Sequence, residues 1–173
     1  MPIKKSAALK LQLDARGPGG DALVVELPSL EATASLGRFL AARAGAGDLI
    51  LLKGPLGVGK TTLARAIIGA FLPGEEVPSP SFSLVQSYET PDLEIVHYDL
   101  YRLESERDIF ELGWEETVGR ALVIVEWPEL LRTQLPADRL EVTLSHGRGE
   151  GERTARIVPH GRWAGLFSAK SGT

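Results

Sequence analysis

The spacing of hydrophobic positions along the chain predicts an ordered series of strands and helices. Continuous apolar runs predict buried strands over 48–53 and 121–125. A repeat of about 3.6 residues predicts a helix over 62–71 with its apolar side chains on one face, ended by a proline and a glycine. The remaining expected elements are strands over 22–27, 83–88 and 93–98, a helix over 30–44, a short helix capped by Ser105 and Asp108 and ending near Gly113, and a late hairpin over 140–145 and 154–158.

This series alternates strands with helices, which is typical of an α/β protein with a layered sheet. We expect one domain over 21–160. Residues 16–20 (Arg-Gly-Pro-Gly-Gly) have the composition of a linker, so we expect a flexible leader over 1–20. We expect residues 161–173 to form a C-terminal tail.

Composition narrows the possible functions. The chain has 173 residues and a formal net charge of −4, which gives no electrostatic reason to expect strong nucleic-acid binding by this chain alone. It has no cysteine, which excludes disulfides, thiolate catalysis and cysteine metal sites. We find no apolar stretch long enough to span a bilayer, and no apolar segment follows Lys4 and Lys5. We therefore expect a cytoplasmic protein that does not bind a membrane.

Residues 54–61 carry the main chemical signal. They read Gly-Pro-Leu-Gly-Val-Gly-Lys-Thr and fit G-x-x-x-x-G-K-[ST], the phosphate-binding loop of nucleotide triphosphatases. A chance glycine-rich turn is the alternative, but the strand before the loop and the helix after it favour phosphate binding. We expect a P-loop NTPase-like three-layer sandwich with a mostly parallel central sheet and a late β-hairpin. The residues expected to bind nucleotide are Gly57, Val58, Gly59, Lys60, Thr61 and Thr62.

Two carboxylates end predicted strands, Asp99 after 93–98 and Glu126 after 121–125. Ligands of open α/β sheets gather at the carboxyl ends of the strands, and Mg²⁺ prefers oxygen ligands. A single acid at such a position is most often only solvated. Two of them beside a phosphate loop indicate a magnesium-nucleotide site, with Lys60 holding phosphate.

Three other features are open to two interpretations. Residues 79–83 (Ser-Pro-Ser-Phe-Ser) are either a switch that responds to the γ-phosphate or a proline-rich connector. Trp127 either packs over a nucleotide or belongs to the core, and packing alone favours the core. His97 shares a strand face with Asp99, and a structural histidine is the more common case. The chain has no asparagine, so it lacks the Asn-Lys-x-Asp guanine signature, which favours ATP over GTP.

Four segments together resemble one family. Residues 54–62 are similar to its G-[DE]-L-G-[AS]-G-K-T-T loop, and residues 77–85 to its V-x-S-P-T-[FY]-x-L-V segment. Residues 97–103 resemble H-[FY]-D-L-Y-R-L, and residues 126–128 match E-W-[PA]. The segments occur in the family order across about 27–128. On these motifs the chain resembles the TsaE family, formerly YjeE.

The resemblance implies a Mg²⁺-dependent ATPase of tRNA threonylcarbamoyladenosine biosynthesis. Its partners would be TsaD and TsaB, whose complex performs the transfer with a donor made by TsaC and is reset by the ATP cycle of the family member. The tRNA would be met only through that complex. By motif position, Thr61 and Glu126 would bind Mg²⁺, and Lys60 would hold phosphate. Asp99 would lie by the γ-phosphate, whereas Ser81 would belong to a switch and Trp127 would be functional rather than core.

The chain departs from the family pattern at Pro55, where an acidic residue is usual, and at Ser81, where threonine is usual. Serine keeps the hydroxyl, and Pro55 removes one N–H before the tight part of the loop. A small-molecule kinase is the alternative function, although Arg102 and Arg107 alone would make a poor arginine lid. A nucleotide-dependent binding module with negligible turnover is a third.

Overall fold

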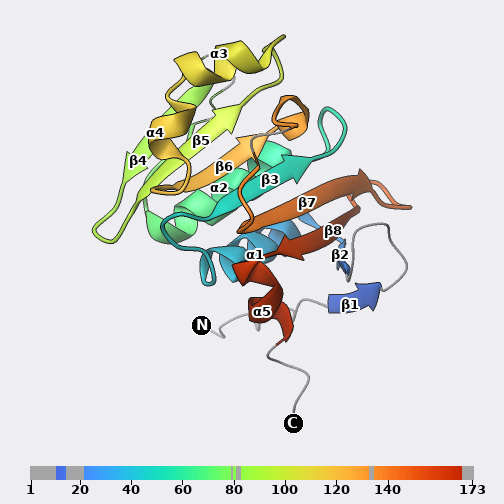
Figure 1. The fold of residues 1–173 in the computed structure, drawn as a ribbon. Helices are drawn as coiled ribbons and strands as arrows, with labels where there is room; N and C mark the ends of the chain where they lie inside the picture. Colours follow the sequence, from blue (N-terminus) through green and yellow to red (C-terminus); the bar gives the residue numbers. More distant parts are fainter. Residues whose placement is uncertain (1–10, 15–21, 79, 81–82, 133–134, 169–173) are drawn as a thin grey trace.

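The centre of the molecule is a mixed β-sheet (Figure 1). The computed structural model describes residues 11–14, 22–78, 80, 83–132 and 135–168. Within these residues the sheet has eight strands in the order β1-β2-β8-β7-β3-β6-β5-β4. The strands are β1 (Leu11–Asp14), β2 (Ala22–Leu27), β3 (Leu49–Lys53), β4 (Val85–Glu89), β5 (Glu94–Asp99), β6 (Leu122–Glu126), β7 (Arg139–His146) and β8 (Arg153–His160).

Short connections and helices complete the fold. The helices are α1 (Leu30–Ala41), α2 (Lys60–Phe71), α3 (Glu106–Glu111), α4 (Trp114–Thr117), α5 (Arg162–Ser168) and a 3₁₀ turn, η1 (Pro128–Leu130). Ser29 caps α1 by accepting from the N–H of Ala32. The expected capping pair is present at α3, where the Asp108 carboxylate accepts from the Ser105 N–H.

The middle of the sheet is parallel and its edges are antiparallel. β3 runs parallel to both β6 and β7, and β5 runs parallel to β6. β7 and β8 pair antiparallel and form the expected late hairpin. The predicted fold class, a P-loop NTPase-like α/β sandwich with a mostly parallel centre, is confirmed.

Alternate residues of β3 pack into two separate apolar layers. Ile50 and Leu52 belong to the cluster that holds the buried faces of α1 and α2. Leu49 and Leu51 belong to a second cluster, on the other face, that includes Trp114 at the start of α4. Because both faces of β3 are covered, the continuous apolar run that predicted this strand is the pattern a central parallel strand requires.

The register of the parallel strands places three chain segments at one edge of the sheet. Leu52 of β3 pairs with Glu126 at the end of β6, and Glu126 pairs with Asp99 at the end of β5. The 54–59 loop leaves β3 at this same edge and leads into α2. The two predicted strand-end carboxylates are therefore neighbours beside the loop.

Two elements lie where the sequence suggested no regular structure. β1, inside the expected leader, pairs antiparallel with β2. α5, inside the expected tail, places Trp163 in the cluster that packs against α1 and α2, where its side chain is fully buried. Both elements are shorter than the window over which hydrophobic periodicity is informative, which explains why they were missed.

Among the described residues, none of the helices has the length and apolar character that spanning a bilayer would take.

A close approach between α1 and α2 yields a stability prediction. A Cβ added at Gly37 of α1 would lie 2.4 Å from the Cβ of Ala66 in α2. We expect Gly37→Ala to lower the free energy of unfolding by about 1–3 kcal/mol, because overpacking outweighs the gain in helix propensity. Chemical denaturation measures the change.

Gly69→Ala is the matched control. Gly69 lies in α2, and a Cβ there would meet no atom within 4 Å. We expect this variant to be neutral or more stable, by up to about 1 kcal/mol. If the two variants unfold at the same denaturant concentration, the contact between α1 and α2 does not disfavour a side chain at position 37.

Candidate nucleotide site

The 54–59 loop has a backbone that only glycine adopts readily. Gly57 and Gly59 have φ angles of 77° and 109°, in the left-handed region. Gly54 is constrained by contact as well, because a Cβ there would come within 2.5 Å of the Leu144 carbonyl oxygen. The glycines of the phosphate-loop motif are therefore required by backbone conformation and by close packing.

Val58 anchors the loop to the body of the protein. Its side chain is 1% exposed and lies in the cluster between the sheet and the helices α1 and α2. Its carbonyl oxygen accepts from the Arg153 Nε at 2.8 Å, which ties the loop to β8. Val58 was expected to bind nucleotide, and its buried side chain leaves only its backbone for that role.

Lys60 is the first residue of α2 and lies folded back on its own loop. Its Nζ donates to the carbonyl oxygens of Gly54 at 2.7 Å and Pro55 at 2.8 Å. The ammonium also lies 4.0 Å from the centroid of the Trp127 ring. The side chain is 4% exposed, so its charge is held by two carbonyls and an aromatic face.

Burial and nearby charges have opposite effects on the pKa of Lys60. Burial lowers the pKa of its ammonium group from the ordinary value, because a desolvated charge is disfavoured. The negative charges of Glu126, Glu129 and Asp99 raise that pKa in opposition. An incoming phosphate would add negative charge beside Lys60 and so favour its charged form further.

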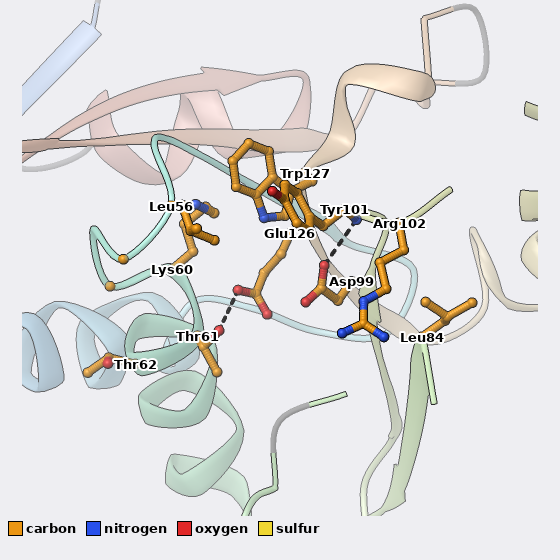
Figure 2. A pocket seen from close by; sticks show the side chains of 12 residues that line it. Leu56, Lys60, Thr61, Thr62, Leu84, Asp99, Tyr101, Arg102, Glu126 and Trp127 are labelled. Atoms are coloured by element: carbon orange, nitrogen blue, oxygen red, sulfur yellow. Dashed lines mark hydrogen bonds between the residues drawn. The ribbon is translucent and has the colours of Figure 1, made fainter. Parts of the chain in front are cut away.

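Thr61 and Glu126 are in direct contact, as Figure 2 shows. The Thr61 Oγ1 donates to the Glu126 Oε1 at 2.7 Å, joining the start of α2 to the end of β6. The other carboxylate oxygen, Oε2, lies 2.8 Å from the Nε2 of His97. Glu126 is 2% exposed and His97 is fully buried. A hydroxyl and a carboxylate at this spacing fit the hard oxygen ligands that Mg²⁺ takes.

Asp99 lies beside Glu126 on the next strand. Its Oδ1 accepts from the Tyr101 N–H at 3.1 Å, which orients the carboxylate at the start of the following turn. Figure 2 shows Asp99 and Arg102 on the side of the pocket opposite Lys60. The structure thus brings Lys60, Asp99 and Glu126 around one space.

Two residues other than glycine hold left-handed backbone at the rim of this space. Trp127 has φ 57° and Leu84 has φ 64°. The Trp127 ring packs on Tyr101, with centroids 4.8 Å apart, and the backbone N–H of Trp127 donates to the Leu52 carbonyl. Leu84 accepts from the Asp99 N–H at 2.9 Å. Such conformations cost energy and are concentrated at functional sites.

The resulting pocket has a volume of about 410 Å³. It holds every predicted site residue that the structure describes except Val58. Ser81 lies outside the described residues. The lining residues are Leu56, Gly57, Gly59, Lys60, Thr61, Thr62, Leu84, Asp99, Tyr101, Arg102, Glu126 and Trp127.

His97 and Arg153 are contacts of the site that the sequence interpretation did not assign. His97 was interpreted as structural, although its position two residues before Asp99 places it on the strand face that Asp99 occupies. Arg153 lies 95 residues from Val58 along the chain, and no sequence pattern links them.

The sheet, the phosphate loop and the helix that follows it define a P-loop NTPase-like protein. Residues 27–155 match the family model described as "Threonylcarbamoyl adenosine biosynthesis protein TsaE". The chain belongs to the TsaE family and so to the proteins of tRNA threonylcarbamoyladenosine biosynthesis.

Individual relatives agree with this assignment. The chain is 43% identical over 139 residues to the tRNA threonylcarbamoyladenosine biosynthesis protein TsaE of Rickettsia felis, covering 79% of this chain and 80% of the relative. It is 35% identical over 124 residues to the protein of the same name from Bacillus subtilis, covering 71% and 77%. A crystal structure of Bacillus subtilis YdiB matches with a TM-score of 0.68 and 26% identity, over 91% of this chain and 94% of that one.

The hydrogen bond between Thr61 and Glu126 predicts a change in stability that can be measured on the protein without nucleotide or metal. Thr61→Val keeps the shape of the side chain but removes its donor, so one oxygen of a buried carboxylate loses its partner. We expect the free energy of unfolding to fall by about 1–3 kcal/mol. Thr61→Ser, which keeps the hydroxyl, is the control and should lose much less. Equal stability of the valine and serine variants would contradict the importance of this hydrogen bond.

Proposed function

We propose that this protein is a Mg²⁺-dependent ATPase that binds the TsaD–TsaB complex and resets it between rounds of tRNA modification. The observation that carries the proposal is the Thr61–Glu126 hydrogen bond, because it joins a phosphate loop to a strand-end carboxylate inside one pocket. The protein would not perform the threonylcarbamoyl transfer, and it would meet tRNA only through the complex.

The loop and Lys60 would hold the phosphates. The N–H groups around Gly57 and Gly59, together with the N-terminus of α2, form an anion site. Thr62 lines the same pocket one residue further along α2. Lys60 would exchange its carbonyl partners for phosphate oxygens, which form stronger hydrogen bonds with a cation.

Thr61 and Glu126 would hold Mg²⁺, which when bound neutralises charge on the phosphates. Asp99 would orient the attacking water or the water shell of the metal, because it lies next to Glu126 and faces the pocket. Catalysis by Lys60, Asp99 and Glu126 would then consist of positioning and charge stabilisation.

Two exposed apolar side chains support a partner surface at this site. Leu56 is 70% exposed and Tyr101 is 55% exposed, and both line the pocket. Large apolar side chains at the rim of a polar pocket fit a surface that another protein covers. Trp127, which packs on Tyr101, would connect that surface to Lys60. Ser81 would belong to the switch that orders against the partner.

ATP fits the sequence better than GTP, because the guanine signature is missing. The alternative function, a small-molecule kinase, needs cations that close over the transferred phosphoryl group. Arg102 lines the pocket, whereas Arg107 is not among the residues that do. The described residues therefore supply no arginine-rich lid.

Lys60→Ala tests the phosphate loop. We expect ATP turnover to be nearly abolished and nucleotide affinity to fall, because a charge-assisted contact worth about 1.5–3 kcal/mol is lost. Lys53→Ala is the control, since Lys53 pairs with Glu141 and does not line the pocket. Steady-state phosphate release is the measurement. A folded Lys60→Ala protein with near-normal turnover would refute the phosphate-loop assignment.

Glu126→Gln tests the metal role. The substitution keeps the size of the side chain but removes the charge that Mg²⁺ prefers. We expect the Mg²⁺ midpoint of ATP hydrolysis to rise, whereas Glu111→Gln, an exposed carboxylate that does not line the pocket, should leave it unchanged. An unaltered midpoint and maximal rate in Glu126→Gln would move the metal role to Asp99.

Affinity for TsaD–TsaB tests the partner role. We expect the isolated protein to hydrolyse ATP slowly, the complex to raise the rate, and a non-hydrolysable ATP analogue to tighten the complex relative to ADP or no nucleotide. Ser81→Ala should weaken this nucleotide dependence, with Ser87→Ala, an exposed serine of β4 outside the 79–83 segment, as the control. The same affinity in all three nucleotide states would exclude the switch mechanism but not the ATPase.

A further inference from the structure

His97 is a buried histidine with a single hydrogen-bond contact among the described residues. Its Nε2 lies 2.8 Å from the Glu126 Oε2, while its Nδ1 has no hydrogen-bond partner there. A histidine that ties elements of a fold together normally uses both ring nitrogens, since an unpaired buried nitrogen costs stability. Among the described residues, the only hydrogen-bond partner of the His97 ring is Glu126.

The two partners of Glu126 come from different parts of the protein. Thr61, on Oε1, belongs to the helix that begins at the phosphate loop. His97, on Oε2, belongs to β5, which is paired directly with β6 by main-chain hydrogen bonds. His97 therefore fixes the carboxylate relative to the sheet, whatever the state of the loop.

A carboxylate oxygen accepts, so Nε2 is the nitrogen that donates in this contact. Glutamate is a long side chain whose rotamers must be restricted if one oxygen is to face the pocket. Groups that hydrogen-bond the far oxygen of a metal-binding carboxylate orient it and tune its affinity. The geometry of His97 meets this requirement.

We propose that His97 is a positioning residue that holds Glu126 in the orientation that receives Mg²⁺ together with Thr61. The proposal rests on the function proposed above, because it assigns His97 a role in the same metal site. In this role His97 orients the Glu126 carboxylate and thereby raises the affinity for Mg²⁺, without contacting the metal or the nucleotide itself.

Two amide substitutions separate this role from a general packing role. In His97→Gln, the amide nitrogen can reach the place of the imidazole Nε2 and still donate to Glu126. In His97→Asn, the shorter side chain places its amide near the position of Nδ1 and cannot reach the carboxylate. Both variants keep a polar group in the same buried site, so the reach of the donor is the main difference between them.

The experiment measures how strongly Mg²⁺ enhances ADP binding, with ADP affinity in EDTA as the reference. We expect His97→Asn to raise the Mg²⁺ midpoint by about 10- to 100-fold and His97→Gln to stay close to the wild type. ADP affinity in EDTA should be the same in all three proteins. In a Glu126→Gln background, His97→Asn should cause no further change, since the carboxylate it positions is gone.

Three results would overturn the proposal. They are an unchanged Mg²⁺ midpoint in His97→Asn, equal impairment of the glutamine and asparagine variants, and a parallel loss of ADP affinity in EDTA. The last two would assign His97 to packing. Because the readout is binding, it decides the role of His97 separately from catalysis. A wild-type protein that binds Mg²⁺ and ADP yet hydrolyses no ATP, alone or with TsaD–TsaB, would refute the proposed ATPase and leave this test intact.

Discussion

The parallel register of β3, β6 and β5 is the constraint on which the site depends. Glu126 pairs with Leu52 on one side and with Asp99 on the other, so both carboxylates end at the edge where the phosphate loop begins. Main-chain hydrogen bonds and two apolar layers hold this register, and a slip of one residue would turn the Glu126 side chain to the opposite face. The register brings Glu126 within reach of Thr61, and the contact with His97 fixes the other oxygen of its carboxylate.

The parts of the site that sequence predicts are those with a local signature. The spacing of the loop motif predicts its glycines, and the pattern of buried strands predicts the acids that end them. The contacts of His97 with Glu126 and of Arg153 with Val58 join residues 29 and 95 positions apart, and they depend on strand order. The same limit applies to the fold: the α/β core has long apolar runs, whereas α5 has seven residues and gains its stability by burying Trp163.

The arrangement around Lys60 bears on how the proposed partner could influence phosphate binding. The ammonium already has two carbonyl acceptors and the face of Trp127, so phosphate must replace contacts that exist. Only the difference between the old and the new contacts contributes to binding. Trp127 holds strained left-handed backbone and packs on the exposed ring of Tyr101. A surface that covers Tyr101 would therefore act on the group that lies over Lys60, which is a physical route from partner to phosphate.

Pro55, the main departure from the family loop, fits this arrangement. It has no N–H to offer phosphate, but the structure uses only its carbonyl, which accepts from Lys60 Nζ at 2.8 Å and from the Val58 N–H at 3.3 Å. Proline also restricts its own φ angle, which reduces the entropy lost when the loop is ordered. Pro55 therefore keeps the carbonyl acceptor that Lys60 uses, and this departure from the family pattern leaves that contact of the loop in place.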